Sequence, residues 1–564
     1  MSATPETGLP FAEDFTRLAG IPGEAEIARL ANAFFKALPG QEAAVPELPF
    51  PPFDEPAPPS HQVVGSVPVA VVPPAIPPSS PSLGGLGVSP ASFAPPAAGE
   101  LYIVSEARRY LDPSGGGGLP VARADALPGA ESLDTLKFGS DARSDPTLPG
   151  ALAGGGHPAF DVQAIRRDFP ILREKVHGRP LIWLDNGATT QKPQAVIDRL
   201  SYFYAHENSN VHRGAHTLAA RATDAYENAR KTVARFVGAS SEDEIVFVRG
   251  ATEGINLVAQ AWGRQHVGPG DDIVISHLEH HANIVPWQQL AEEKGANLRV
   301  IPVDDSGQIL LGAYERLLSD RTRIVAVTHV SNALGTVVPV KDVIDRAHAA
   351  GALALIDAAQ SIAHHRIDVR ALDADFLVFS GHKVFAPTGI GVLYGKRDLL
   401  NAMPPWQGGG NMIADVTFER TIYQAAPARF EAGTGNLADA VGLGAALDYL
   451  ERIGIENIAW HEHDLLTYAT AGLRTIPGLT LFGTAAEKIG VLSFLLAGFT
   501  PEEVGQALDR YGIAVRAGHH CAQPILRRFG VEGTVRASLA LYNTTEDIDC
   551  LIGALRQIAA LRSA

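Results

Sequence analysis

The order of apolar and polar residues changes at about residue 160. From there to about residue 400, short apolar runs rich in Val, Ile and Phe alternate with stretches in which apolar residues recur every three or four positions. The first pattern predicts buried strands and the second predicts amphipathic helices. Seven strands are predicted, at Ile245–Val248, Ile273–Ser276, Leu298–Pro302, Ile324–Thr328, Ala352–Ile356, Phe376–Phe379 and Gly391–Tyr394. Strands that alternate with helices form a mostly parallel sheet covered on both faces, so we expect an α/β fold.

Other patterns flank this core. Residues 161–172 predict a short helix, and residues 180–193 predict a strand and a turn that lead into a helix. After the loop from Pro404 to Gly410 the expected order is helix, strand, helix, strand and a final helix from Thr545. This change of order predicts a smaller α+β domain at the carboxyl end.

Residues 1–158 differ in composition from the rest of the chain. Of the 40 prolines, 26 lie before residue 160, and the Pro/Gly/Ala-rich segment buries too little apolar surface to offset its ordering entropy. We therefore expect a mostly disordered arm with one amphipathic helix over residues 23–38. The apolar face of that helix consists of Ile27, Leu30, Ala31, Phe34, Phe35 and Leu38. The expected division is an arm over 1–158, a large domain over 159–430 whose first segment contributes to the small domain, and a small domain over 431–564.

The net charge and the number of cysteines exclude some classes of protein. The 46 basic and 62 acidic residues give a net charge of −16, which disfavours nucleic acid as a partner. The two cysteines, Cys521 and Cys550, are too few for a disulfide framework, so a reducing compartment is expected. The amino terminus does not resemble a signal peptide, and no apolar run approaches the ~18 residues that span a bilayer. These features predict a cytoplasmic protein that binds neither nucleic acid nor membrane.

Two motifs that follow neighbouring predicted strands carry the main chemistry. Asp357 opens D-A-A-Q after one strand, and Lys383 closes S-G-H-K after the next. The carboxyl edge of a parallel sheet is where α/β proteins bind ligands. A lysine that can form a Schiff base and a carboxylate that can keep a pyridine nitrogen protonated suit pyridoxal phosphate (PLP). These two residues alone leave a buried Asp–Lys ion pair as the alternative.

Further polar residues follow strands at the same edge. Short hydroxyl or imidazole side chains beside the start of a helix suit a phosphate group, and these are Thr252, Ser380 and His382. His280 is placed to stack on a flat cofactor ring, although a histidine pair is more often structural. Asn332 and Gln360 are candidates for the phenolic oxygen of the cofactor, and Asn332 also for a substrate carboxylate. No metal site is predicted.

Cys521 lies in the segment R-A-G-H-H-C-A, which begins at Arg516. An arginine, two histidines and a glycine around a thiol favour the thiolate, whereas a free cysteine is more often a small buried hydrophobic residue. Cys550 falls on the apolar side of the final predicted helix, and we assign it to the core. Arg536 offers the planar guanidinium that suits a carboxylate.

Together these segments resemble the group II (Suf-type) cysteine desulfurases of the aminotransferase class-V family, which are PLP enzymes of fold type I. The resemblance covers roughly residues 160–564 and rests on segments in the same order: V-H-R-G-A-H-T-L, R-G-A-T-E-G-I-N-L-V-A, E-H-H-A-N-I-V-P-W, T-H-V-S-N-A-L-G-T, D-A-A-Q, S-G-H-K, R-F-E-A-G-T and R-A-G-H-H-C-A. It implies conversion of L-cysteine to L-alanine, with the sulfur kept as a persulfide on an enzyme cysteine. One departure from the family is the segment Gly408–Asp415, which lies where the family's second subunit approaches the cofactor. Because Asp415 is acidic, the resemblance does not assign all of the phosphate contacts there.

The resemblance also implies a role for each matched residue. For the cofactor it assigns Lys383 to the Schiff base, Asp357 to the pyridine nitrogen, Gln360 to the phenolic oxygen, His280 to ring stacking and proton transfer, and Thr252, Ser380 and His382 to the phosphate. Cys521 is the implied nucleophile. For the substrate it implies Arg536 and Asn332 at the carboxylate, with Arg516, His212 and Arg213 in matching segments.

The implied partners are a second copy of the chain and a protein that accepts the sulfur. Selenocysteine lyase or another class V PLP enzyme is the alternative activity, since the former would share the whole site. A scaffold without catalysis is the alternative of a different class, and the intact set of Lys383, Asp357 and Cys521 argues against it.

The arm has a resemblance of its own. The segment E-I-A-R-L-A-N-A-F-F resembles the L-A-R-L-A-N-A-L-F element in the amino-terminal extensions of desulfurases packaged as cargo in family 2A encapsulin nanocompartments. It implies that the arm docks on an encapsulin shell protein and that the enzyme lies inside the compartment. The alternative is that the helix over residues 23–38 packs on the body of its own chain.

Overall fold

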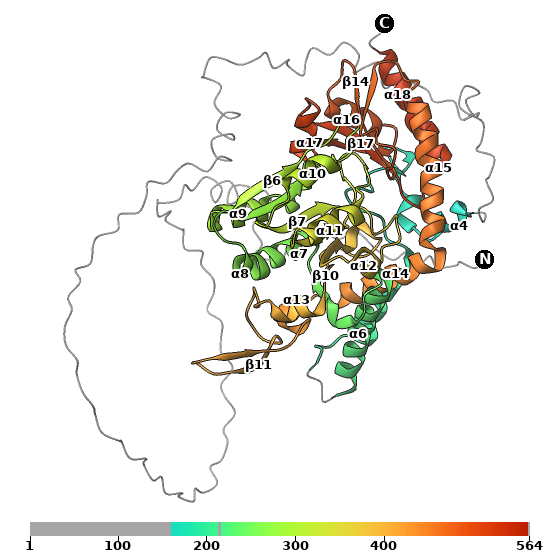
Figure 1. The fold of residues 1–564 in the computed structure, drawn as a ribbon. Coiled ribbons are helices and arrows are strands. Elements are labelled where there is room, and N and C mark those ends of the chain that lie inside the picture. The colour runs from blue at the N-terminus through green and yellow to red at the C-terminus, as the bar shows by residue number, and fades with distance from the viewer. Residues whose placement is uncertain (1–159, 213–215, 562–564) are drawn as a thin grey trace, which may run out of the picture. The chain divides into compact units, whose positions relative to one another are not determined.

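The computed structural model describes residues 160–212 and 216–561 (Figure 1). The predicted arm, its helix over residues 23–38 and Arg213 lie outside the described residues. Within the described ranges, no helix is long and apolar enough to cross a membrane.

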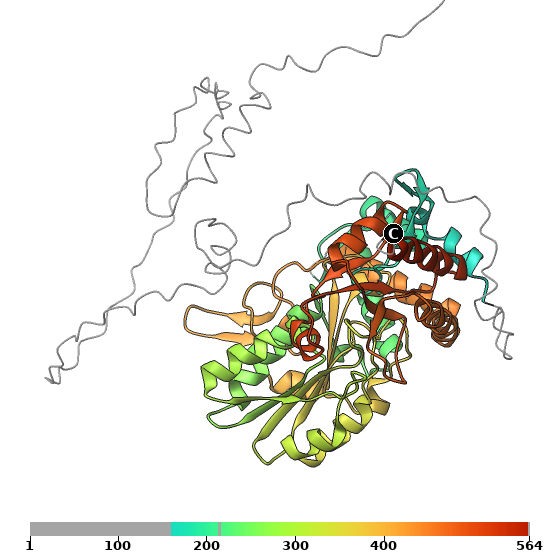
Figure 2. The same cartoon turned by 90° about the horizontal axis from the view of Figure 1, so that it is seen from above.

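A seven-stranded sheet forms the centre of the larger part of the described structure (Figure 2). Its strands are β4 (Ile245–Val248), β5 (Asp272–Ser276), β6 (Asn297–Ile301), β7 (Thr322–Thr328), β8 (Leu353–Asp357), β9 (Phe376–Ser380) and β10 (Gly391–Gly395). They lie in the order β4-β10-β9-β8-β7-β5-β6. Neighbouring strands run parallel, except that β10 is antiparallel to both β4 and β9. Each strand lies within two residues of its predicted bounds, so the predicted α/β fold with a mostly parallel seven-stranded sheet is confirmed.

Alternate residues of the central strands enter two different hydrophobic cores. Along β9, Leu377 and Phe379 belong to the core under α6, α11 and α14, whereas Phe376 and Val378 belong to the core under α7 and α9. Both faces of the sheet are therefore covered, which explains why these strands read as continuous apolar runs. The helices around the sheet are α5 (Gln194–His206), α6 (Thr217–Val237), α7 (Ala251–Val258), α8 (Arg264–His266), α9 (Val285–Lys294), α10 (Leu311–Leu317), α11 (Val340–Ala349), α12 (Val369–Leu372), α13 (Arg397–Ala402) and α14 (Leu437–Ile453).

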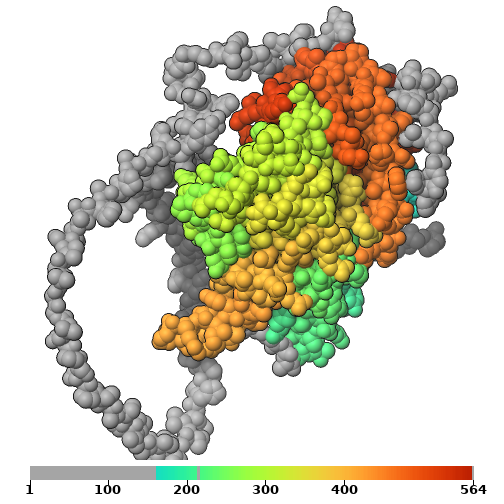
Figure 3. Space-filling model, viewed as in Figure 1, coloured from blue at the N-terminus to red at the C-terminus, as the bar shows by residue number. Residues whose placement is uncertain are grey.

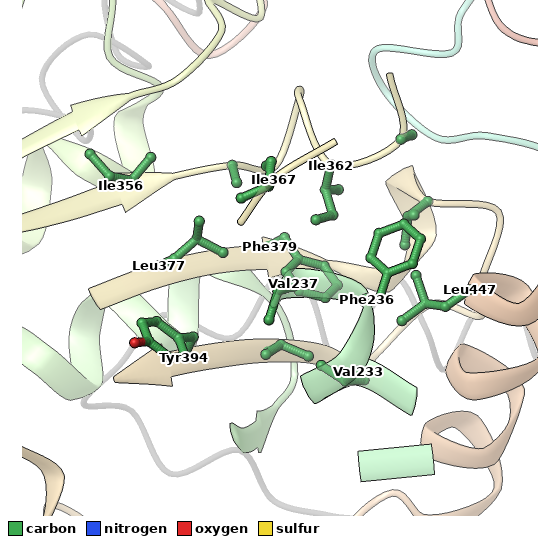
Figure 4. Close-up of a cluster of buried hydrophobic side chains, with 14 of the residues drawn as sticks. Val233, Phe236, Val237, Ile356, Ile362, Ile367, Leu377, Phe379, Tyr394 and Leu447 are labelled. Atoms are coloured by element: carbon green, nitrogen blue, oxygen red, sulfur yellow. The ribbon is translucent and has the colours of Figure 1, made fainter. Parts of the chain in front are cut away.

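Figure 4 shows part of the first core. Side chains of α6 and α14 pack there against side chains from the central strands and the segment after β8, namely Val233, Phe236, Val237, Leu447, Ile356, Ile362, Ile367, Leu377, Phe379 and Tyr394. Full burial of one such Val, Leu, Ile or Phe side chain contributes about 1.5–3 kcal/mol relative to exposure. This packing fixes the carboxyl ends of β8 and β9, where Asp357 and Ser380 lie.

The smaller part of the structure, which we call the second layer, is built on a four-stranded sheet. The strands of this sheet lie in the order β13-β14-β17-β16. The elements of the second layer are β13 (Leu479–Phe482), β14 (Val491–Leu496), β16 (Arg516–Gly518), β17 (Thr534–Ser538), α15 (Ile455–Leu473), α16 (Pro501–Asp509), α17 (Gln523–Arg528) and α18 (Thr545–Ala560). A separate hydrophobic core lies between this sheet and α15, α16 and α18. An early segment joins the layer, because β3 (Ile182–Trp183) pairs in parallel with β15 (Ile513–Ala514).

The carboxyl-terminal half is more elaborate than the predicted order of helix, strand, helix, strand and helix. The structure adds a hairpin of β11 (Ile413–Val416) and β12 (Thr421–Tyr423), which projects from the body (Figures 1 and 3). It also divides the first helix into α14 and α15 at Gly454. The hairpin escaped prediction because both of its strands are short and largely exposed, so they carry no core-facing alternation. The final helix begins at Thr545 as predicted, with Thr544 and Asp547 forming a capping box.

The predicted helix over residues 161–172 is shorter in the structure. It appears as α4 (Val162–Arg167), and a 3₁₀ turn over Pro170–Arg173 follows it. Pro170 explains the break, because the residue before a proline is disfavoured in the α conformation. Phe169 is accordingly extended. Two short strands, β1 (Lys175–Val176) and β2 (Arg179–Pro180), precede β3.

Candidate functional site

A cavity of about 180 Å³ lies where the carboxyl ends of β7, β8 and β9 meet the four-stranded sheet. We call it the Lys383 cavity. Eleven of the thirteen predicted site residues line it: Thr252, His280, Asn332, Asp357, Gln360, Ser380, His382, Lys383, Arg516, Cys521 and Arg536. The structure thus brings together predicted site residues up to 284 positions apart in the sequence, from Thr252 to Arg536.

Lys383 ends a 3₁₀ turn, Gly381–Lys383, that follows β9 directly. Burial lowers the pKa of its amine to about 8, and the charge of Asp357 opposes part of that shift. The turn is held by Thr190, whose backbone N–H donates to the His382 carbonyl at 2.9 Å and whose hydroxyl accepts the Phe385 N–H at 2.8 Å. A lysine amine with a pKa lowered toward neutrality is suited to attack a carbonyl carbon.

Asp357 is the last residue of β8 and is 4% exposed. Burial raises the pKa of its carboxyl, while the Ala359 N–H, at 2.9 Å, and the charge of Lys383 lower it. Gln360 lies one turn further, and its amide donates to the Gly187 carbonyl at 2.8 Å. A buried carboxylate opposite a buried amine fits a protonated ring nitrogen at one end of a cofactor and a Schiff base at the other.

His280 precedes the 3₁₀ turn His281–Asn283, and its Nδ1 accepts the Ala282 N–H at 3.1 Å. Burial, together with the charge of Lys383, lowers the pKa of its imidazole to about 3, so the ring is neutral at physiological pH. A neutral ring beside Lys383 suits stacking on a flat cofactor. Ser380 also lines the cavity, and its hydroxyl accepts the N–H of Ala251, the first residue of α7, at 2.9 Å.

The donor set of the Lys383 cavity therefore fits PLP. The structure supplies a lysine of lowered pKa, a buried carboxylate, a neutral imidazole and a helix start with hydroxyl groups. His382 adds no positive charge to the cavity, because burial, with the charges of Lys383 and Lys192, lowers the pKa of its imidazole to about 4.

Glu279 supports this site but was not predicted from the sequence. Its fully buried carboxyl accepts hydrogen bonds from the Ser276 hydroxyl at 2.5 Å, the Asn283 amide at 2.6 Å and the Thr328 N–H at 3.1 Å. It thereby ties the turn that carries His280 to the ends of two strands. Burial raises the pKa of this carboxyl to about 8. Only its position directly before the histidine pair in the sequence could have marked it.

Two arginines, Arg516 and Arg536, also line the cavity. Arg536, on β17, is 2% exposed, and its Nη1 donates to the Asn332 carbonyl at 2.9 Å. Arg516, on β16, is its direct partner across the sheet. Asp185 lies between them and contacts Nη2 of Arg536 and Nε of Arg516, each at 3.2 Å. Asp185 was not predicted as a site residue, although it stands at the end of a predicted strand.

Cys521 occupies a tight turn at the rim of the Lys383 cavity. Both His520 and Cys521 have left-handed backbone conformations, with φ of 53° and 54°. The hydrogen bonds that hold the turn include those from Cys521 N–H to His519 Nδ1 at 3.0 Å, from His281 N–H to the Cys521 carbonyl at 2.8 Å, and from the Asn332 amide to the His520 carbonyl at 2.6 Å. The thiol is partly buried. The other cysteine, Cys550, lies on α18 against the third core, and burial raises the pKa of its thiol.

The structure does not bring His212 to the Lys383 cavity. Its Nε2 contacts Glu227 at 2.8 Å, and it lines a separate cavity of about 210 Å³ with Tyr226, Glu431 and Thr434. We call this the Tyr226 cavity. It lies next to a wider hollow of about 520 Å³, which shares the same tyrosine and glutamate and contains neither the lysine nor the thiol. Arg213 lies outside the described residues.

Comparisons with known proteins agree on one family. The model of the family described as aminotransferase class-V matches residues 182–551. A cysteine desulfurase of Synechococcus elongatus is 66% identical over 415 residues, which are 74% of this chain but only 66% of that protein. A cysteine desulfurase of an Enterobacter species is 53% identical over 71% of this chain and 98% of its own length.

Solved structures show the same fold. The crystal structure of the cysteine desulfurase CsdA (S-sulfonic acid) from Escherichia coli is 40% identical in sequence, with a TM-score of 0.67. The match covers 72% of this chain and all of that one. The predicted fold class, that of PLP-dependent transferases of fold type I, is confirmed by this likeness and by the parallel sheet.

Proposed function

Because the chain belongs to the aminotransferase class-V family, we propose that it is a PLP-dependent cysteine desulfurase of the group II (Suf) type. The observation that carries the proposal is that one cavity is lined by Lys383, Asp357 and Cys521 together. An aminotransferase needs the first two residues but has no use for a thiol at this place. The high identity to curated cysteine desulfurases supports the same conclusion.

The residues of the Lys383 cavity divide into two sets. Lys383 would hold the cofactor covalently, Asp357 would bind its ring nitrogen and Gln360 its phenolic oxygen. His280 would cover the ring, and Thr252, Ser380 and His382 would receive its phosphate. When bound, PLP supplies an electron sink for the bond broken at the substrate's α-carbon.

The second set acts on L-cysteine. Arg536, with Asn332 and Arg516, binds the carboxylate, because a guanidinium pairs well with a planar carboxylate. The Lys383 amine, with its pKa lowered to about 8, takes the α-proton at Nζ. The Cys521 thiolate attacks the sulfur of the substrate, forming an S–S bond as the substrate's C–S bond breaks. The electron pair of that bond remains on the carbon skeleton, which takes up protons, with His280 as a carrier, and leaves as L-alanine.

The direct test is to measure L-alanine and sulfide from L-cysteine with the PLP-loaded protein in the presence of a thiol reductant. Wild type should form both products in equal amounts, and Lys383→Ala should form neither. Formation of pyruvate, or of an amino acid other than alanine, would contradict the proposed reaction. Replacement of L-cysteine by L-selenocysteine in the same assay separates a desulfurase from a selenocysteine lyase.

We further propose a homodimer in which each chain completes the site of its partner. The hairpin of β11 and β12 exposes apolar side chains, with Val416 58% exposed and Phe418 fully exposed, and such surfaces mark contacts between proteins. His212 and Arg213, which match an active-site segment, would then serve the Lys383 cavity of the other chain. The shortage of positive charge at the phosphate end of that cavity supports the same arrangement.

Mixed dimers test this proposal. His212→Ala and Lys383→Ala should each be inactive as pure dimers, whereas co-expression of the two should restore activity, because one site of a mixed dimer then has both residues. Sedimentation should give the mass of two chains. The homodimer proposal would be contradicted if the co-expressed variants had no activity, or if a monomer were fully active.

For the arm we propose docking on an encapsulin shell protein, so that the enzyme works inside a cytoplasmic nanocompartment and delivers its sulfur to a separate acceptor protein. The amphipathic pattern over residues 23–38 supports a helix that binds in a groove. Deletion of residues 1–155 should leave desulfurase turnover nearly unchanged and abolish encapsulation. The arm fused to a fluorescent protein should carry it into shells, and a fusion that stays outside would refute the docking proposal.

A further inference from the structure

Arg516 and Arg536 form an unfavourable pair unless a third group offsets their charges. They are direct cross-strand partners on β16 and β17, and like charges at such positions are destabilising. The side chain of Arg536 is 2% exposed, so water screens little of its charge. Asp185 supplies the opposite charge, with one carboxylate oxygen 3.2 Å from each guanidinium.

The position of Asp185 is fixed independently of this ion pair. The Ser538 N–H, on the same strand as Arg536, donates to the Leu184 carbonyl at 2.7 Å, and Asp185 forms a parallel bridge with Ser538. The main chain therefore places residue 185 beside β17 without any contribution from the side chains of the cavity. Its side chain is 11% exposed.

Arg536 is held on three sides. Nη1 donates to the Asn332 carbonyl at 2.9 Å, Nη2 contacts Asp185, and the guanidinium lies over Gly187, where a Cβ would be only 3.1 Å from Cζ. Its Nε is buried and has no hydrogen-bond partner among the described residues, although Arg536 lines the Lys383 cavity. An unpaired buried N–H costs about 1–3 kcal/mol, which an incoming acceptor would recover.

We propose that Asp185 is a positioning residue for the substrate carboxylate: it occupies Nη2 of Arg536 and Nε of Arg516, so that Nε of Arg536 is left as the donor for the incoming carboxylate. The inference rests on the proposed function and adds a residue that makes no contact with the substrate itself. Two other roles are possible for such a carboxylate. A purely structural role would affect stability alone, and a purely electrostatic role would weaken the attraction of the site for anions.

Asp185→Asn separates these roles, because it keeps the shape of the side chain and removes its charge. If positioning dominates, L-cysteine should bind about tenfold more weakly, the loss expected for one charge-assisted hydrogen bond. Cysteamine, which is L-cysteine without the carboxylate, should bind within about twofold of its original affinity. A purely electrostatic role predicts tighter binding of L-cysteine instead, because the net positive charge of the site rises by one.

The measurement is a titration of the holoenzyme with each ligand, followed by the visible absorbance of its cofactor, in a Cys521→Ala background that prevents turnover. Asp271→Asn is the matched control, since Asp271 is also a buried carboxylate that bridges two arginines, Arg321 and Arg323, each at 3.0 Å. It precedes β5 at the opposite end of that strand from His280, so it should lower the melting temperature without changing either affinity.

Selective weakening for L-cysteine in Asp185→Asn, absent from Asp271→Asn, supports the inference. Unchanged or tighter binding of L-cysteine, or equal losses for both ligands, overturns it. The Asp185→Ala variant should lose more affinity for L-cysteine than Asp185→Asn does, with little loss for cysteamine. An equal loss of affinity for cysteamine in this variant would also overturn the inference. Alanine formation is measured separately, on the protein that keeps Cys521. If Asp185→Asn selectively weakens the binding of L-cysteine but the protein with Cys521 forms no alanine, only the proposed function is contradicted. Alanine formation without selective weakening would contradict only the role of Asp185.

Discussion

Two turns meet at the Lys383 cavity, and their surroundings differ. The turn of Lys383 continues into Val384, Phe385 and Ala386, which are fully buried, and Thr190 fastens it from another segment. The turn of Cys521 is less enclosed: His520 and Ala522 are buried, but His519 and Pro524 are exposed, and two of its residues, His520 and Cys521, have left-handed backbones. One turn thus belongs to the interior of the large sheet, and the other belongs to the rim.

The difference matches the chemistry proposed for each turn. A residue that holds a cofactor must keep its amine in one place, and burial also lowers the pKa of that amine toward the working range. A residue that receives sulfur must reach the substrate and then present the sulfur to an acceptor outside the cavity. The comparison therefore predicts that the two turns respond to different perturbations.

The largest effect is expected from replacement of the thiol, which should abolish alanine formation but leave the binding of PLP intact. Cys521→Ala should still load PLP and change its absorbance with L-cysteine, because the Lys383 turn is untouched, but alanine formation should fall by roughly 10³-fold or more. Cofactor absorbance and alanine release measured on one preparation give both results. Alanine formation at more than a few per cent of the wild-type rate would show that Cys521 does not receive the sulfur.

The pH dependence of cofactor loading tests the burial of Lys383. An amine attacks PLP only when deprotonated, so a pKa of about 8 predicts that apoenzyme loads about tenfold faster for each pH unit up to 8 and no faster above it. An exposed lysine, with an ordinary pKa of about 10.4, would give a rise that continues past pH 9. Stopped-flow absorbance between pH 6 and 10 distinguishes the two curves, and a continuing rise would contradict the buried environment.

The support from Thr190 should be measurable as stability. Thr190→Val keeps the shape of the side chain but leaves the Phe385 N–H without its acceptor, so the free energy of unfolding should fall by about 1–3 kcal/mol. Thr336→Val is the matched control, because the Thr336 hydroxyl is buried without a partner among the described residues. That variant should be neutral or slightly stabilising in the same denaturant titration. A loss of equal size in both variants would show that the hydrogen bonds of Thr190 contribute nothing specific.

The smallest effect is expected at the second cysteine. Cys550 is partly buried on α18 and packs against the third core, away from both turns. Cys550→Ala should therefore change alanine formation by less than about twofold, with at most a modest loss of stability from the smaller side chain. Loss of activity in this variant, with activity kept in Cys521→Ala, would exchange the roles assigned to the two thiols.

The sequence was informative where local patterns decide the outcome. The seven strands follow from apolar runs, and the strand ends then place Asp357 and Lys383 at one edge. The last helix begins at Thr545, as predicted. The sequence did not predict the contacts that join distant segments. Asp185 lies 351 positions from Arg536, Thr190 lies 192 from His382, and neither belongs to a recognisable motif of its own.

The hairpin of β11 and β12 escaped prediction for a related reason. Short exposed strands show no alternation toward a core, so only the folded chain reveals them. His212 illustrates a different gap. The resemblance predicted it at the active site, but within one chain it lines the Tyr226 cavity instead, and nothing in the sequence indicated that separation.

The measurement that tests the central claim most directly is peptide mass spectrometry after a single turnover. Holoenzyme is mixed with one equivalent of L-cysteine without reductant or acceptor, then alkylated and digested. The account predicts one additional sulfur atom on the peptide that contains Cys521, in an amount equal to the L-alanine formed, and none on the peptide that contains Cys550. Additional sulfur on Cys550, or alanine released while Cys521 remains an unmodified thiol, would contradict it.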